Sequence, residues 1–191
     1  LEFRRVLFRS KSSVSRTFER KIFMIDLIVY SSETGSCEKY AQMIAKELNV
    51  PAVPMSAAEG RPCKRVLYIS WLTAGKINGL SKAMQRFPLA AVMQVGITPV
   101  TGETAAKTRK ANKIPANTEV FCKQGGLHMD RLSAPYRAAM TVVNKVVLAQ
   151  LSKKKNDLDD QERALYGMVT TGDGEPADWD VSDVVAWCRD N

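Results

Sequence analysis

Apolar and polar positions along this chain form blocks that predict strands and helices in alternation. Short apolar runs typical of buried strands begin at Ile25, Arg65, Leu89 and Thr118. Between these runs, apolar residues recur at helical spacing, as in the segment after Ser36. This order predicts an α/β fold in which parallel strands are covered by helices on both faces. After the first strand, the expected strands are Val50–Pro54, Arg65–Trp71, Leu89–Gly96 and Thr118–Gly126, and the expected helices are one that contains Tyr40–Leu48, then Leu80–Phe87, Glu103–Asn112, Arg131–Leu151, Leu158–Val169 and Asp180–Arg189.

The spacing of these elements indicates one domain. Residues 24–155 hold the alternating strands and helices, and residues 156–191 form a helical extension that we expect to pack on the same domain. Only Met55–Lys64 separates the second strand from the third, and it contains Gly60 and Pro62. We therefore expect a turn or a short helical piece there instead of a full crossover helix. The segment Thr171–Pro176 lacks the spacing of a calcium loop and is interpreted as a turn.

The first segment of the chain dominates its positive charge. Leu1–Phe23 is rich in Arg and Ser, which resembles a mitochondrial transit peptide, but Leu1–Ser10 also resembles a translated sequencing adapter. We favour the second interpretation, a non-native or disordered extension before a natural start at Met24. The whole chain has 28 basic and 20 acidic residues, and without Leu1–Phe23 the totals are 21 and 18. This weakly basic remainder gives no reason to expect a nucleic-acid partner.

The numbers and positions of cysteine and histidine give no support for a disulfide framework, a multi-histidine metal site or a Ser-His-Asp catalytic arrangement. The four cysteines are far apart in the sequence, which is typical of a reducing compartment and favours a cytoplasmic location. His128 is the only histidine, so neither a multi-histidine metal site nor a Ser-His-Asp catalytic arrangement is supported, and no catalytic or metal-binding residue is assigned. No apolar run is long enough for a membrane span. The run Lys153–Lys155 has two interpretations, a solvated helix end or a peripheral contact with an anionic membrane or an acidic partner.

The most informative stretch is the loop between the first strand and the first helix. Ser32, Thr34 and Ser36 provide hydroxyl groups around Gly35, where the backbone can approach a ligand closely. The start of the following helix offers unpaired N–H groups, so the loop suits an anion. The Lys-containing loop of triphosphate-binding proteins and the G-x-G-x-x-G dinucleotide pattern are both absent, which favours a monophosphate. A simple helix N-cap without a ligand is the alternative.

This loop resembles the phosphate loop of the flavodoxin family, which binds flavin mononucleotide (FMN). The resemblance rests on the pattern Tyr30, Ser32, Thr34, Gly35, Cys37 and Ala41, with Cys37 at a position that is usually threonine. It implies a doubly wound five-stranded parallel sheet of order 2-1-3-4-5, with the cofactor at the carboxyl ends of the strands. A thiolate at Cys37, activated by the helix dipole, would suit a redox sensor, but a simple replacement of threonine is the favoured interpretation.

Three later segments extend the resemblance. The loop Leu72–Ile77 is similar to the Gly-Lys-Ile loop that lies against the flavin ring in this family, and the loop Ile97–Glu103 would flank the ring from the other side. Near the end of the last strand, Gly125-Gly126 is followed by Leu132-Ser133 before a long helix. This arrangement is similar to the corresponding segment in the protoporphyrinogen-oxidase-type branch of the family. His128, just after Gly-Gly, would either touch the flavin or be an exposed loop residue. The cofactor-binding residues implied are Ser32, Glu33, Thr34, Gly35, Ser36, Cys37, Thr73, Ala74, Gly75, Lys76, Gly96, Ile97 and Thr98.

The resemblance implies an FMN-binding protein that acts in electron transfer, with a redox partner protein or a quinone as its partner. If the protein is an enzyme, it would be an FMN-dependent oxidoreductase. Lys76 turned toward the ring would favour the anionic reduced flavin, and Gly75 would let a peptide adjust to the reduced ring. A different class remains open, a cofactor-free flavodoxin-fold interaction module, which is favoured by Cys37, Thr73 and the short crossover.

Overall fold

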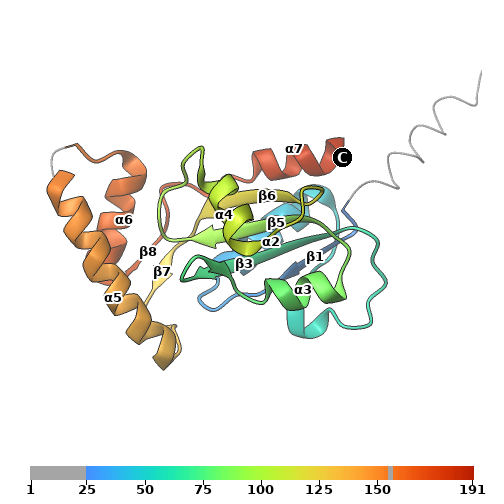
Figure 1. Ribbon diagram of the computed structural model, residues 1–191, viewed down its shortest axis with the longest axis horizontal. Helices are drawn as coiled ribbons and strands as arrows, with labels where there is room; N and C mark the ends of the chain where they lie inside the picture. The colour runs from blue at the N-terminus through green and yellow to red at the C-terminus, as the bar shows by residue number, and fades with distance from the viewer. Residues whose placement is uncertain (1–24, 155–156) are drawn as a thin grey trace, which may run out of the picture.

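The computed structural model describes residues 25–154 and 157–191, in which a parallel sheet lies between helices (Figure 1). The expected extension at 1–23 lies outside the described residues. Five strands make the parallel sheet in the order β2-β1-β3-β5-β6, so the predicted fold class and strand order are confirmed. These strands are β1 (Leu27–Tyr30), β2 (Ala52–Pro54), β3 (Val66–Thr73), β5 (Leu89–Gly96) and β6 (Glu119–Gln124).

Alternate side chains of the strands enter two separate apolar layers, because successive residues of a strand point to opposite faces. In β1, Ile28 belongs to the layer under α2 (Ser36–Leu48) and α7 (Ser182–Asp190), whereas Val29 belongs to the layer under α3 (Leu80–Arg86). The helix α4 (Thr104–Asn112) adds Ala105 to the edge of this second layer. Helices therefore cover both faces, as the continuous apolar strands predict.

The segment between β2 and β3 contains one short helical turn, the 3-10 helix η1 (Met55–Ala57). This agrees with the expectation of a short helical piece in place of a crossover helix. Two small features were not expected. The strand β4 (Lys76–Ile77) folds back antiparallel on the end of β3, and β7 (Leu127–His128) pairs with β8 (Asp173–Gly174), so the segment interpreted as a turn contains a short strand.

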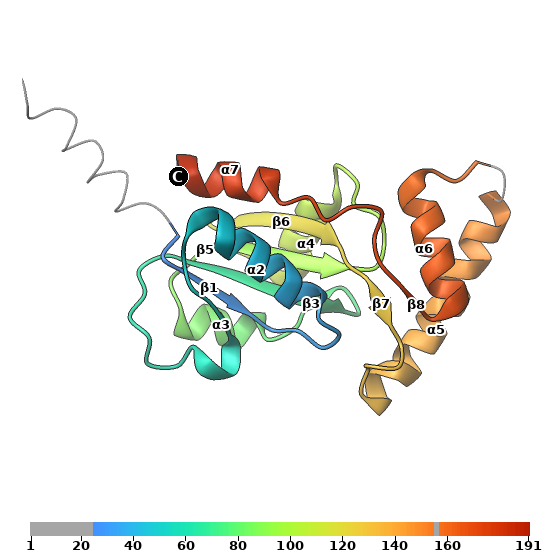
Figure 2. The ribbon, with the colours of Figure 1, turned by 180° about the vertical axis from the view of Figure 1, so that it is seen from behind.

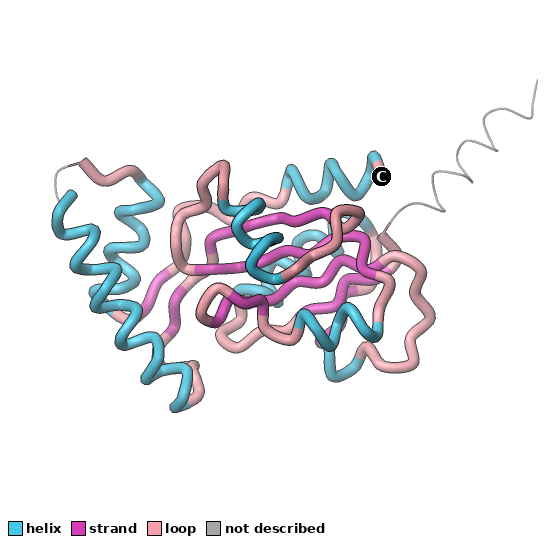
Figure 3. The backbone as a smooth tube through the Cα atoms, viewed as in Figure 1, coloured by secondary structure: helices cyan, strands magenta, loops and turns pink. Residues whose placement is uncertain are grey.

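Two helices near the end of the chain form an arm beside the sheet (Figure 2). The helix α5 (Ala134–Leu151) is followed by the 3-10 helix η2 (Ser152–Lys154) and by α6 (Asp160–Thr171). The two α-helices pack on each other through their own apolar cluster, which includes Val147, Leu165 and Met168. Figure 3 shows that the two short strands β7 and β8 join this arm to the rest of the molecule. The chain then returns across the sheet to α7, which lies against α2.

Candidate functional site

The loop between β1 and α2 lies at the carboxyl end of the sheet, where the strand order changes direction. The strand β1 has β2 on one side and β3 on the other, so the connections from β1 and β3 leave toward opposite sides. Ligands of open α/β sheets bind at this position because the diverging loops leave a crevice there. The structure thus places Ser32, Glu33, Thr34, Gly35 and Ser36 at the switch point of the sheet.

The backbone of this loop leaves the start of α2 open to an anion. Gly35 is the N-cap residue with φ 106°, and no side chain caps the first turn of α2. The hydroxyl of Ser32 accepts a hydrogen bond from the Gly35 N–H at 3.1 Å, which closes the turn. Within the described residues, a Cβ placed on Gly35 would have only Arg131 Nη1 within 4 Å, at 4.0 Å. The first N–H groups of α2 and the positive end of its dipole therefore face an accessible space next to a guanidinium.

Two predicted phosphate ligands turn their side chains away from this space. The hydroxyl of Ser36 is buried and accepts a hydrogen bond from the Gly126 N–H at 3.1 Å. The Cys37 side chain is 2% exposed and packs in the apolar layer under α2. Burial raises the pKa of the Cys37 thiol to about 12, so the thiol stays protonated and shielded. This disfavours the redox-sensing interpretation, and only the backbone of Cys37 can face a ligand.

The loop after β3 is a tight hairpin. Ala74 and Gly75 connect β3 to β4 with φ values of 50° and 77°, so both lie in the left-handed region, as in a type I′ turn. Asn112 at the end of α4 holds this hairpin from outside. It accepts a hydrogen bond from the Ile77 N–H at 2.8 Å and donates one to the Gly75 carbonyl at 3.1 Å.

Lys76 does not point toward the predicted ring site. Its ammonium group donates to the Ala111 carbonyl in the last turn of α4. Carbonyl groups at a helix C-terminus attract a cation, which explains this orientation. The Gly75 carbonyl is also engaged by Asn112, so a rotation of this peptide would have to break that hydrogen bond. The peptide after Gly75 is therefore less free to rotate than the presence of a glycine there suggested.

Thr73 and the loop after β5 lie at the same end of the sheet. The hydroxyl of Thr73 is buried and has no hydrogen-bond partner among the described residues. Gly96 ends β5, and its carbonyl accepts a hydrogen bond from the Gly125 N–H at 2.8 Å. The Ile97 carbonyl accepts one from Gln124 Nε2 at 2.8 Å, while Thr98 is exposed. An unpaired buried hydroxyl is unfavourable, so a polar partner at Thr73 would stabilise this end of the sheet.

A segment far along the sequence covers the loop after β1. The Ser133 N–H donates to Glu33 Oε1 at 3.2 Å, and Arg131 Nη1 donates to the Thr34 carbonyl at 3.4 Å. Nothing in the local sequence pattern marks Arg131 as a site residue. Glu33 thus acts as a structural acceptor, and Arg131 brings positive charge beside Gly35.

The start of α5 also contacts the hairpin after β3. Tyr136 meets Trp71 edge to face, with ring centroids 6.2 Å apart, and its hydroxyl accepts a hydrogen bond from Asn78 Nδ2 at 3.2 Å. Neither Trp71 nor Tyr136 is among the cofactor-binding residues that the resemblance implied. Two aromatic side chains therefore stand beside the hairpin at the predicted ring site.

His128 belongs to the joint between the sheet and the arm. Its Nδ1 lies 2.5 Å from Asp173 Oδ1, and its Nε2 lies 3.7 Å from Glu175 Oε1. Lys39 lies 3.6 Å from Glu175 Oε2 and stacks over Trp179. These charged groups connect β7 and β8 with the outer side of α2, which is a structural role for His128.

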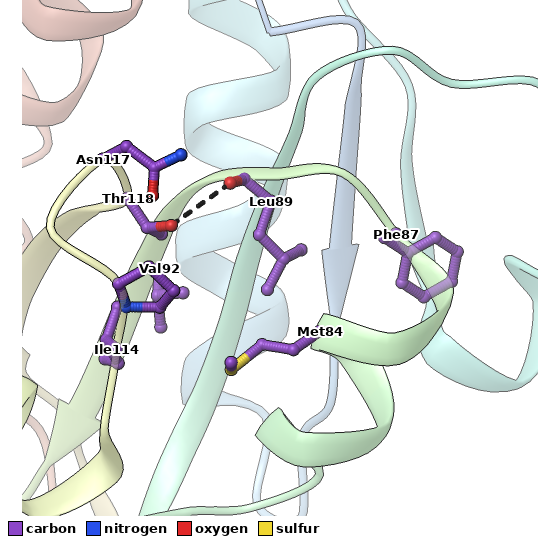
Figure 4. A pocket seen from close by; sticks show the side chains of 8 residues that line it. Met84, Phe87, Leu89, Val92, Ile114, Asn117 and Thr118 are labelled. Atoms are coloured by element: carbon purple, nitrogen blue, oxygen red, sulfur yellow. Dashed lines mark hydrogen bonds between the residues drawn. The ribbon is translucent and has the colours of Figure 1, made fainter.

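A pocket lies at the opposite end of the sheet, near the amino ends of the strands β5 and β6 (Figure 4). It has a volume of about 200 Å³ between the end of α3 and the connection that precedes β6. Six of its eight lining residues are apolar, and the Thr118 hydroxyl donates to the Leu89 carbonyl at its rim. None of the predicted cofactor-binding residues lines it.

Within residues 25–154 and 157–191, no three His, Cys, Asp or Glu side chains come together as a metal site. No helix in the described part of the chain has the length and apolar character to cross a membrane. When the chain is compared with known proteins, no family model and no curated protein matches it.

Proposed function

We propose that this protein binds FMN and acts in electron transfer. The observation that supports the proposal most directly is the open N-terminus of α2 at the switch point of the sheet. This helix has no side-chain cap, and the approach to Gly35 is free except for the guanidinium of Arg131. A terminal phosphate would satisfy the free N–H groups and would be attracted by the helix dipole and by Arg131.

The residues around the loop fit a phosphate group. Thr34 and the backbone N–H groups from Ser36 onward would hold the phosphate, and Arg131 would contribute its charge. Ser32 would act mainly through the turn that it closes with Gly35. The hydroxyl of Ser36 is turned away and accepts a hydrogen bond from the Gly126 N–H, so Ser36 would contribute only its backbone N–H.

The flavin ring would lie between the hairpin after β3 and the loop after β5. Thr73 fits such a ligand because its buried hydroxyl lacks a partner among the described residues. Trp71 and Tyr136 would provide aromatic contacts. When bound, FMN supplies one-electron and two-electron redox chemistry. Because Lys76 is turned to α4, we expect no lysine charge at the ring and therefore no increase in the reduction potential from this residue.

The test is a flavin titration followed by fluorescence quenching and visible absorption, with FMN and riboflavin compared. We expect FMN to bind more tightly, because riboflavin lacks the phosphate. Thr34→Asp should weaken FMN binding by about ten-fold or more, since a carboxylate would stand where the phosphate binds, and should change riboflavin binding much less. Thr170→Asp on the exposed side of α6 makes the same substitution away from the site and should leave both affinities unchanged.

Equal affinity for FMN and riboflavin, or equal effects of the two substitutions, would contradict a phosphate site at this loop. If the folded protein binds neither flavin, the alternative of a cofactor-free interaction module becomes the better account. The inward position of Cys37 and the occupied hydroxyl of Ser36 are the observations that favour this alternative.

If FMN binds, the electron partner is a redox protein or a quinone. Reduced protein mixed anaerobically with a water-soluble quinone would test the second class, because flavin absorption would recover as the quinone is reduced. If flavin absorption does not recover with any quinone tested, a redox protein remains as the partner of the proposed site.

A further inference from the structure

The outer face of α5 is apolar, although α5 lies on the surface of the arm. Among the described residues, the large apolar side chains that are most exposed are Met84 and three valines of α5, of which Val142 is 64% and Val146 is 53% exposed. Ala138 and Ala149 lie on the same side, one turn before Val142 and about one turn after Val146, and both are exposed. The opposite side of α5 packs on α6. A contiguous group of exposed apolar side chains on a helix marks a surface that binds another protein or a membrane.

The charges beside this face have one sign. The stretch 131–154 contains five basic residues and no acidic residue. Lys145 lies beside Val142 and Val146, and Lys153 follows one turn after Ala149. Neither lysine forms an ion pair with a carboxylate in the part of the chain that the structure describes, whereas Lys154 is paired with Glu162 at 2.8 Å. The occupant of this face should therefore be negatively charged.

A second copy of the chain fits this face poorly. Contact between two α5 helices would bring Lys145 and Lys153 of one copy near the same residues of the other, and α5 has no carboxylate to compensate them. A protein partner is also less favoured, because protein interfaces depend on aromatic and arginine anchors, whereas this face offers valine and alanine. The arm projects from the sheet in both views of the ribbon, and Val142, Val146 and Ala149 of α5 are exposed.

We propose that the outer face of α5 binds the surface of an anionic lipid bilayer. Val142 and Val146 enter the interface between headgroups and acyl chains, and Lys145 and Lys153 contact lipid phosphates. Binding of this kind depends on buried apolar area together with attraction between basic residues and anionic lipids, and it needs no shape complementarity. The proposal is independent of flavin binding, because Val142, Val146, Lys145 and Lys153 are not among the residues of the proposed flavin site.

Flotation of the full chain with vesicles tests this proposal. Vesicles of phosphatidylcholine mixed with phosphatidylglycerol are compared with vesicles of phosphatidylcholine alone, and we expect binding to the anionic vesicles that decreases as salt is raised. The double substitution Lys145→Gln and Lys153→Gln should weaken binding by about 30-fold, since each basic residue near an anionic surface contributes roughly five-fold. Val142→Asp with Val146→Asp should weaken it by at least about ten-fold.

The matched control is Met84→Asp with Ala106→Asp, which makes the same change of charge at exposed positions of α3 and α4. All variants keep the basic residues of 1–23, so any contribution of that segment is constant. Circular dichroism verifies that each variant is folded. The proposal predicts that the control binds as the unmodified chain does.

Three results would overturn the proposal. The first is that the unmodified chain does not prefer anionic vesicles. The second is that the control loses as much binding as the α5 variants, which would assign the effect to net charge. The third is self-association in sedimentation velocity that Val142→Asp with Val146→Asp abolishes, because the face would then bind a second copy.

Discussion

Gly125 is packed so closely that even one added methyl group should destabilise the protein. A Cβ on Gly125 would lie 2.6 Å from Val95 Cγ1 and 3.1 Å from Ser36 Cβ. Its φ lies outside the left-handed region, so the backbone itself would accept alanine. Carbon atoms at optimal contact are about 3.5–4.0 Å apart, so Gly125→Ala must displace its neighbours by roughly 1 Å.

The cost of this displacement can be estimated from the two neighbours. Val95 is buried in β5 with a stiff branched side chain, and Ser36 is buried in the first turn of α2. Neither can move freely, so we expect the upper part of the range for overpacked cores, about 2–3 kcal/mol. For a chain of this size, that corresponds to a decrease in Tm of roughly 4–12 °C.

Urea unfolding followed by circular dichroism, together with the Tm, measures this cost. The matched control is Gly102→Ala, because a Cβ on Gly102 would meet nothing within 4 Å and its φ is also ordinary. This control should be neutral or more stable by about 0.4–1 kcal/mol, since alanine restricts the unfolded chain. If Gly125→Ala is as stable as Gly102→Ala, the close packing between β5, α2 and the end of β6 is wrong. Because Ser36 starts α2, Gly125→Ala should also weaken binding of FMN if the proposed site is correct.

Three further predictions follow from the contacts of the site. Asn112→Ala should cost about 1–2 kcal/mol in urea unfolding by releasing the β3–β4 hairpin, whereas the exposed Asn117→Ala should change little. Tyr40→Phe should cost about 1–3 kcal/mol, because the Tyr40 hydroxyl donates to the buried Gln124 carbonyl at 2.7 Å; an unchanged midpoint would contradict a buried bond. Burial raises the pKa of the Cys37 and Cys188 thiols from 9.0 to about 12. The contribution of each protonated thiol to the free energy of unfolding is therefore complete below pH 9 and decreases as the pH rises toward 12. The contribution of each thiol should fall by about 1 kcal/mol by about pH 10. In urea unfolding, the free energy of unfolding of the double variant Cys37→Ala with Cys188→Ala should therefore decrease less between pH 9 and pH 12 than that of the unmodified protein.

The predicted positions of the strands agree with the structure because each of them depends on a local pattern. The three central strands β1, β3 and β5 contain continuous buried runs, and the range of β5 was predicted to the residue. Right-handed crossovers then imply a doubly wound sheet, and the resemblance to the flavodoxin family implied its strand order. The positions of the candidate loops follow from this order, since the carboxyl ends of parallel strands meet at one edge.

The orientations of the candidate side chains did not follow from local patterns. Cys37 and Lys76 both lie in predicted cofactor loops, yet one turns into the core and the other toward the end of α4. Each orientation depends on a segment that is distant in the sequence. The same holds for Arg131, which lies next to Thr34 although 97 residues separate them in the chain.

The resemblance to the flavodoxin family implied the order of the parallel sheet, and the sequence by itself determined the alternation of strands and helices and the hydroxyl-rich loop after the first strand. These properties depend on hydrophobic periodicity and turn residues within a few positions of each other. Only the tertiary structure decided which hydroxyl groups are free, that Tyr136 and Arg131 stand beside the loops, and that the outer face of α5 is exposed. The periodicity of α5 shows that it is apolar, but which side is covered depends on where α6 packs, and that is set by contacts between segments that no local pattern relates.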